Sequence, residues 1–206
     1  MSKLEVISCE QRTDDWYRAR MGIPTASMFG TVMAQGKSGG ESIGRASYMR
    51  KLAGEVITET PMESYTNDDM DRGNAIEPEL RARYAFEADV EVEQVGFIKN
   101  GNKGCSPDGL IGKDGMVQIK SAAPHVMIEI LMSGEVPKKH LPQCHGELWV
   151  AERAWTDLVI GSVSNKLPLF CQRLHRDETY IRRIAGAVAD FNIELREMVE
   201  KIRRLS

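Results

Sequence analysis

The sequence predicts a mixed α/β fold in one domain that spans residues 1–206. Apolar residues recur at helical spacing near both ends of the chain, whereas short apolar runs separated by Gly-rich turns occupy the middle. The resulting order is helix, helix, strands, helices, strands, helix. Because 42% of the residues are apolar and 28% are charged, the chain can bury a sizeable core.

Three helices and a loop are predicted in the first half of the chain. Thr25 and Ser27 precede an apolar run, as N-cap residues do, so a helix should begin near Ser27. Apolar residues then recur at helical spacing from Ser42 to about Glu59, and Pro61 ends the pattern. The other elements are a flexible loop over 36–42 and a helix over 74–87, whose first turn would hold Glu77, Pro78 and Glu79.

Strands and helices alternate in the second half. Helices are expected after Pro124 and after Pro137, the second covering HLPQCHGELWVAER. Between Ile181 and Leu205 a three-four spacing of apolar residues predicts one long C-terminal helix with an apolar stripe. We expect this stripe in the core, with a subunit contact as the alternative. The predicted strands are 90–99, 107–112 and 115–120, joined by GNKG and GKDG turns as a small meander, then Trp155–Val163 and Leu169–Leu174.

The composition argues against several protein classes. A net charge of −3 does not indicate a broadly basic surface, so any nucleic-acid contact would be confined to a channel or pocket. The four cysteines form no CxxC pair, which argues against a zinc site or a disulfide framework. No opening segment resembles a signal peptide, and no stretch reaches the roughly 18 apolar residues of a membrane span. We therefore expect a soluble, cytoplasmic protein.

The segment 105–121, CSPDGLIGKDGMVQIKS, holds the polar groups with the clearest chemistry. Asp108 can give an oxygen to Mg²⁺, which needs few protein oxygens because phosphate and water complete its shell. Gln118 and Lys120 lie two residues apart on a predicted strand, so both point to one face. Ile119 points the other way, although its carbonyl can face the same ion. Lys120 could then orient or deprotonate an attacking water and neutralise a phosphate.

Four segments together resemble one nuclease family. SPDGL, a short turn and then apolar-x-[E/Q]-x-K resemble the PD-(D/E)xK signature, more narrowly that of the lambda exonuclease group, also called the YqaJ-type viral recombinase family. DDWYRARMGIPTAS resembles the family's W-x-x-x-R-x-G-x-x-T-A-S motif, RGNAIEPELRARY its G-x-x-x-E helix, and HLPQCHGELWV its later helix. The segments keep the family's order from Asp14 to Val150.

The resemblance implies a restriction-endonuclease-like core in which helices flank a mixed central sheet. It implies a 5′-to-3′ exonuclease that uses Mg²⁺, with Mn²⁺ as a substitute and two ions in the site. Such an enzyme digests the 5′-ended strand of linear double-stranded DNA processively to mononucleotides and leaves a 3′ overhang for a single-strand annealing protein. The resemblance also implies a homotrimeric ring around DNA and a bacterial or phage-infected cell.

Residue by residue, the resemblance implies two sets of site residues. The catalytic and metal-binding set is Asp108, Glu77, Gln118, the Ile119 carbonyl and Lys120, with Gln118 at the usual Glu position. The set for the 5′-terminal phosphate of the strand being cut is Arg20, Thr25, Ser27 and Ser106, with Gln143 facing the same pocket. Arginine forks and hydroxyls at a helix start suit a phosphate.

Ordinary structural interpretations remain open for single residues. Glu77 can complement a helix N-terminus, Ser27 can cap a helix, and Arg20 can be a solvated surface charge. Other conspicuous residues are expected outside the site: Trp16 and Trp149 in the core, Lys138 and Lys139 in solvent or at a DNA backbone, and His125, His140, His145 and His175 without a metal, His145 alone near the site.

The amide at position 118 leaves three explanations open. Gln118 is sufficient because Asp108 and Glu77 supply the charge, or the missing carboxylate has moved to Glu147, four residues after Gln143 on one helix face. In the third explanation the chain binds DNA ends without cutting them. A further rival is an endonuclease with the same core, which would also cut circular DNA.

Overall fold

The computed structural model describes residues 4–36, 40, 42–62, 68–164 and 166–205. For residues 68–72 and 74 it describes the helix but not the side chains. Most of the loop predicted over 36–42 lies outside the described residues. No helix in the described ranges is long and apolar enough to cross a membrane.

A mixed four-stranded sheet forms one half of the fold, as predicted. Its order is β4-β5-β6-β7, with β5 and β6 parallel and the outer pairs antiparallel. Leu158 and Val159 are successive residues of β6 and pack into different clusters, because successive side chains of a strand point to opposite faces. The four strands are β4 (Gly109–Ile111), β5 (Gly115–Ser121), β6 (Trp155–Gly161) and β7 (Phe170–His175).

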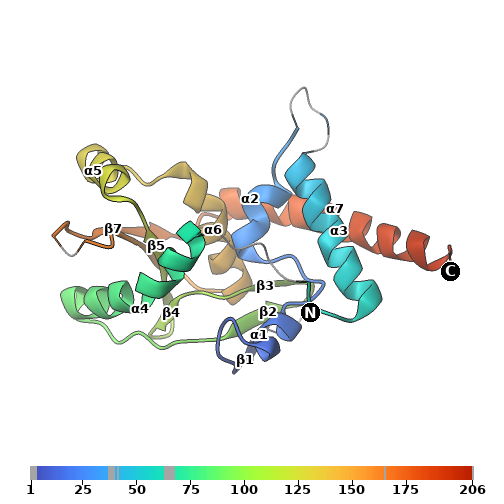
Figure 1. Ribbon diagram of the computed structural model, residues 1–206, viewed down its shortest axis with the longest axis horizontal. Coiled ribbons are helices and arrows are strands. Elements are labelled where there is room, and N and C mark those ends of the chain that lie inside the picture. Colours follow the sequence, from blue (N-terminus) through green and yellow to red (C-terminus); the bar gives the residue numbers. More distant parts are fainter. Residues whose placement is uncertain (1–3, 37–39, 41, 63–67, 165, 206) are drawn as a thin grey trace.

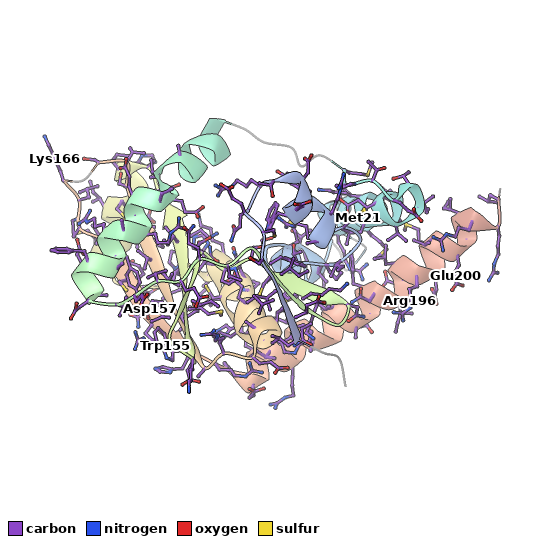
Figure 2. All side chains as sticks on the ribbon, turned by 90° about the horizontal axis from the view of Figure 1, so that it is seen from below. Met21, Trp155, Asp157, Lys166, Arg196 and Glu200 are labelled. Atoms are coloured by element: carbon purple, nitrogen blue, oxygen red, sulfur yellow. The ribbon has the colours of Figure 1, made fainter. Side chains whose placement is uncertain are left out.

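Helices flank both faces of this sheet (Figure 1). On one face α4 (Asp68–Ala88) packs Leu80 and Tyr84 against β5 and β6. On the other face α5 (Pro124–Ser133) and α6 (Leu141–Ala151) pack against β6 and β7, and the 3-10 helix η3 (Lys138–His140) leads into α6. Asp157 on β6 accepts hydrogen bonds from the Tyr84 hydroxyl at 2.6 Å and from Nε and Nη2 of Arg173, each at 2.8 Å. Figure 2 shows Asp157 close to Trp155 on this strand.

A second, antiparallel sheet lies on the other side of α6. It contains β1 (Leu4–Ile7), β2 (Phe97–Asn100) and β3 (Lys103–Cys105), in that order. The Asn100 side-chain amide donates to the Val150 carbonyl at 3.0 Å, which ties this sheet to α6. Three short helices follow β1 in the chain: α1 (Asp14–Ala19), the 3-10 helix η1 (Ala26–Met28) and α2 (Phe29–Val32). An added Cβ at Gly146 would collide with the Phe29 ring, so glycine permits the close approach of α2 and α6.

The long C-terminal helix is confirmed as α7 (Glu178–Arg203), which packs beside α3 (Ile43–Thr58) (Figure 1). The Asp177 carboxylate caps it by accepting from the Thr179 and Tyr180 N–H groups. Its stripe is core from Ile181 to Val199. Beyond that point Ile202 is 44% exposed and Leu205 is 77% exposed. Figure 2 labels Arg196 and Glu200 on the part of α7 that extends away from the sheets.

Two predictions of local structure were wrong. Helix α4 begins at Asp68 rather than near 74, so Pro78 lies inside the helix and not in its first turn. The strand expected over 90–99 is confined to 97–100, and the expected meander is divided between two sheets. Glu93 makes only an isolated bridge to Leu110, while β1 and β3, which pair on either side of β2, were not predicted. Short strands of this kind depend on their partners and carry little periodicity of their own.

Candidate active site

Asp108 lies just before β4 and is 8% exposed. Its Oδ2 accepts the Ile119 backbone N–H at 2.6 Å and a hydrogen bond from the Gln118 side-chain amide. Burial is the main cause that raises the pKa of Asp108; the charge of Glu77 adds to the rise and that of Lys120 opposes it. Two donors thus hold a carboxylate that folding has removed from water.

The alternation along β5 brings Gln118 and Lys120 to one face, as predicted. Ile119 packs with Tyr84 and Leu80 beneath α4. Gln118 instead bonds to Gln143 of α6, and Lys120 lines a cavity together with Gln143. The hairpin therefore places an acid, an amide and an amine at one end of the sheet.

The Gln118 amide is held at both ends. Its Nε2 donates to Asp108 and lies 3.4 Å from the Ile119 carbonyl oxygen, and its Oε1 accepts from Gln143 Nε2 at 3.0 Å. Gln118 is 2% exposed. In this arrangement the NH₂ group, rather than the amide oxygen, faces the Asp108 carboxylate.

Glu147 continues this chain of hydrogen bonds. Gln143 Nε2 also donates to Glu147 Oε1 at 2.8 Å, whereas Glu147 Oε2 has no hydrogen-bond partner among the described residues. Burial raises the pKa of Glu147 to about 8; the charge of Asp108 adds to the rise and the Gln143 hydrogen bond opposes it. We call Asp108, Gln118, Gln143 and Glu147 the acid–amide cluster.

Glu77 lies beside Asp108 but is paired with two arginines. Its carboxylate accepts from Arg12 at 2.6 Å and from Arg81 at 3.1 Å. Arg81 Nη1 also donates to the Asp108 backbone carbonyl at 3.2 Å. Glu77 thus positions Arg81 against the hairpin, and its role as a second metal ligand stays a prediction.

A cavity of about 620 Å³ lies next to the acid–amide cluster. Asp108 and Gln118 are buried and are not among its lining residues; Gln118 bonds to the lining residue Gln143 and to Asp108. Glu77 is not among the lining residues. The lining includes every residue predicted for phosphate binding, together with Lys120 and Glu147: Arg20, Thr25, Ser27, Ser106 and Gln143.

A second group of cavity residues is organised around Arg20. The Arg20 guanidinium carbon lies 3.9 Å from the Trp16 ring centroid, and its Nη2 donates to Thr25 Oγ1 at 3.2 Å. Trp16 Nε1 donates to Ser106 Oγ at 2.8 Å, and Thr25 Oγ1 lies 3.3 Å from Ser27 Oγ. Arg20 is therefore a positioned side chain rather than a solvated surface charge. We call Trp16, Arg20, Thr25, Ser27 and Ser106 the arginine cluster.

Comparison with known proteins decides the family. The YqaJ-like viral recombinase domain matches residues 15–154. The chain belongs to this family. Two crystal structures of the alkaline exonuclease LHK-Exo, from Laribacter hongkongensis, are similar to it: one superposes with a TM-score of 0.83 at 31% identity, and the complex with dAMP with 0.82 at 33%. Both alignments cover 93% of this chain and 97% of LHK-Exo.

More distant similarity extends only to the fold. A phage related exonuclease from Haemophilus somnus 129PT superposes with a TM-score of 0.65 at 11% identity, over 87% of this chain and 96% of that one. A search of curated protein sequences found no match. The YqaJ-like domain thus covers the hairpin, α6 and the arginine cluster, and leaves α7 outside.

The oxygen atoms of the YqaJ-like site fit a hard cation. Asp108 offers a carboxylate, Ile119 a backbone carbonyl, and Glu147 a buried oxygen without a partner among the described residues. The Gln118 oxygen accepts from Gln143 and would have to turn toward Asp108 to join them. Within the described ranges no three His, Cys, Asp or Glu side chains gather as metal ligands. At this site the carboxylates of Asp108 and Glu147 are kept apart because the side-chain amides of Gln118 and Gln143 lie between them.

Several residues lie elsewhere than expected, or do more. Trp16 is buried as predicted but also forms the platform for Arg20, which the four-residue spacing of the pair could have indicated. His145 packs on Tyr180 with ring centroids 4.8 Å apart and does not line the cavity. His140 lies closer to the site: burial lowers the pKa of its imidazole to about 4, and the charge of Lys120 adds to the fall.

Proposed function

We propose that this chain is a metal-dependent DNA nuclease that removes nucleotides from the 5′ end of linear double-stranded DNA. The observation that carries the proposal is the shared cavity: an arginine cluster suited to a terminal phosphate and Lys120 of the PD-(D/E)xK hairpin line one hollow. The similarity to LHK-Exo, an alkaline exonuclease crystallised with dAMP, supports an exonuclease that handles deoxynucleoside monophosphates.

The arginine cluster would bind the 5′-terminal phosphate. Arg20 presents a planar fork that matches two phosphate oxygens, and its stacking on Trp16 fixes the plane of the fork. The hydroxyls of Thr25, Ser27 and Ser106, which line the same cavity as Arg20, would donate further hydrogen bonds to the phosphate. A phosphate held there places the first phosphodiester bond near Lys120, which selects strand ends over internal positions.

Lys120 would act on the attacking water, either by orienting it or by taking its proton, and would offset the charge that develops on the scissile phosphate. The P–O3′ bond then breaks and releases a 5′-mononucleotide. Asp108, Gln118 and the Ile119 carbonyl would hold Mg²⁺, or Mn²⁺ in its place, with Glu77 as a further carboxylate that must first leave Arg12. When bound, two such ions supply Lewis acidity at the phosphate.

Digestion of the 5′-ended strand leaves a 3′ single-stranded overhang, which is the substrate of a single-strand annealing protein. We propose that such a protein is the partner of this chain in phage-type recombination, in the cytoplasm of a bacterial or phage-infected cell. A homotrimeric ring would keep DNA in place between cuts and account for processive digestion. Basic residues would line its channel, and the acidic residues that make the net charge −3 would lie on its outer surface.

The second candidate function is DNA-end binding without cleavage. Two observations favour it: the NH₂ group of Gln118 faces Asp108, and Glu77 is paired with Arg12 and Arg81. Both features reduce the negative charge that is free for a divalent cation. This candidate predicts a 5′-phosphate-dependent complex with DNA but no product.

Product analysis on three DNA substrates tests the proposal. Linear duplex with one 5′-phosphate, the same duplex with 5′-hydroxyl ends, and a covalently closed circle are each incubated with Mg²⁺ or Mn²⁺. We expect mononucleotides from the phosphorylated strand, slower release from hydroxyl ends and none from the circle, with Asp108→Asn as the inactive control. A cut circle would establish the endonuclease instead, and binding without product would establish the end-binding candidate.

A further inference from the structure

Glu147 is a buried acid without a structural partner for one of its oxygens. It is 1% exposed, and its Oε2 makes no hydrogen bond with any described residue. No ion pair involves Glu147 in the part of the chain that the structure describes. Buried polar atoms of folded proteins are almost always satisfied, and each exception calls for an explanation such as backbone strain, a catalytic role, a water or an ion. A residue needed only for packing would not carry a carboxylate here, because a glutamine or leucine fills the same space at lower cost.

The position of Glu147 links it to the hairpin through one side chain. Gln143 lies one turn earlier on α6, and its Nε2 donates both to Glu147 Oε1 at 2.8 Å and to Gln118 Oε1 at 3.0 Å. Gln118 in turn donates to Asp108. The two acids therefore bracket a pair of amides, and the amide nearer Asp108 stands where this type of hairpin usually carries its second acid.

The charge available to a cation also points to Glu147. Gln118 brings no charge, and the Glu77 carboxylate is engaged by Arg12 and Arg81. Without Glu147, Asp108 would be the one carboxylate at the site that no arginine engages. Mg²⁺ sites in proteins commonly use one or two carboxylates with waters and substrate oxygens, and Glu147 would supply the second.

We propose that Glu147 supplies the carboxylate that position 118 lacks, so that the acid of the hairpin has moved from β5 to α6 and Gln143 orients it toward the metal-binding oxygens of Asp108 and Ile119. The inference rests on the proposed metal-dependent function and names a metal-holding residue outside the hairpin. It also explains the amide: a third carboxylate at position 118 would face Asp108 and Glu147 in a buried space where, before a metal binds, Lys120 is the cation that acts on both acids.

Mn²⁺ binding to the full chain without DNA tests the assignment, measured from the EPR signal of the free ion. We expect Glu147→Gln to weaken binding by roughly tenfold or more. Adding Gln118→Glu to that variant should restore most of the lost affinity, because the carboxylate returns to β5. Gln118→Glu should raise Mn²⁺ affinity less in the wild-type background than in the Glu147→Gln background. A double-mutant cycle quantifies this difference.

Glu55→Gln is the matched control. Glu55 is also buried and lines the same cavity, and the substitution from glutamate to glutamine is the same. Its oxygens, however, accept from the Gly22 and Met62 N–H groups. Its substitution should lower the midpoint of thermal unfolding and leave Mn²⁺ affinity unchanged. If Glu147→Gln does not fold, Glu147→Leu takes its place, with thermal unfolding as the check.

The outcomes separate the two proposals. Wild-type protein that binds Mn²⁺ and cuts DNA, with Glu147→Gln binding as tightly, overturns the role of Glu147 and leaves the nuclease intact. Equal gains from Gln118→Glu in both backgrounds overturn it as well. Wild-type protein that binds no Mn²⁺ without DNA overturns this role, whereas the product analysis on DNA decides separately on the proposed nuclease.

Discussion

The arginine cluster and the acid–amide cluster border one cavity but differ in how completely their polar groups are satisfied. In the arginine cluster Arg20 stacks on Trp16 and bonds to Thr25, and Trp16 bonds to Ser106. In the acid–amide cluster a buried Glu147 oxygen has no partner among the described residues. Burial raises the pKa of both acids of that cluster.

This difference indicates which part of the site is complete before a ligand arrives. A buried donor or acceptor without a partner costs about 1–3 kcal/mol, whereas satisfied groups cost little. The arginine cluster is therefore preorganised and should hold the same shape with or without DNA. The acid–amide cluster stores unfavourable free energy that a cation would relieve, so its stability should depend on conditions more than that of its neighbour.

The largest effect is expected from Lys120→Ala. Removing the amine takes away the group that acts on the attacking water, and general acid–base groups contribute on the order of 10²–10⁴ in rate. We expect about a thousandfold loss of mononucleotide release, measured in single-turnover reactions on 5′-phosphorylated duplex, with DNA binding retained. Lys113→Ala, in the turn between β4 and β5, serves as the control. If Lys120→Ala instead abolishes DNA binding and spares the rate of bound DNA, Lys120 belongs functionally with the arginine cluster.

Much of the fold follows from periodicity along the chain. The stripe of α7 and the helices after Pro124 and Pro137 are long or sharply bounded, so their patterns identify them. β1 and β3 have three or four residues each and exist through pairing with β2, which no local pattern shows. Proline favours the first turn of a helix and so predicts a start near Pro78, but the helix begins ten residues earlier and continues through it.

The candidate site could be predicted in its members but not in its connections. Strand alternation places Gln118 and Lys120 on one face, and the resemblance brings in Arg20 and Gln143 from distant segments. The direction of the Gln118 amide and the pairing of Glu77 with two arginines depend on hydrogen bonds between elements far apart in sequence. Such tertiary choices decide which carboxylates stay free, and spacing alone does not reveal them.

The second effect concerns the pH dependence of stability without metal. The pKa of Glu147 rises from its ordinary value of 4.5 to about 8 in the folded protein. The unfolded chain therefore loses this proton first as pH rises. Stability from this group is fully present below pH 4.5, falls between 4.5 and 8, and then levels off. We expect a slope on the order of 1 kcal/mol per pH unit in urea unfolding with EDTA.

Glu147→Gln isolates this contribution, because the amide has no proton to lose in that range. The variant should be more stable than the wild type at pH 7.5 to 8, with the gap closing toward pH 5. Glu55→Gln should keep the wild-type slope. Identical slopes in wild type and Glu147→Gln would remove the contrast between the two clusters, because burial of Glu147 would then carry no pH-dependent cost in the acid–amide cluster.

The smallest effect is expected from Arg20→Lys, which keeps the charge of the arginine cluster and removes its geometry. Lysine has no planar fork and stacks less well on Trp16, so one bidentate contact to the terminal phosphate is lost. We expect the preference for 5′-phosphate over 5′-hydroxyl ends to fall by about tenfold, measured as the ratio of initial rates on the two duplexes. Arg18→Lys, at an exposed position of α1 two residues before Arg20, should leave the ratio unchanged. An equal loss on both duplexes would mean that Arg20 contacts the DNA backbone in general, and preorganisation of the arginine cluster would then serve affinity rather than the choice of strand end.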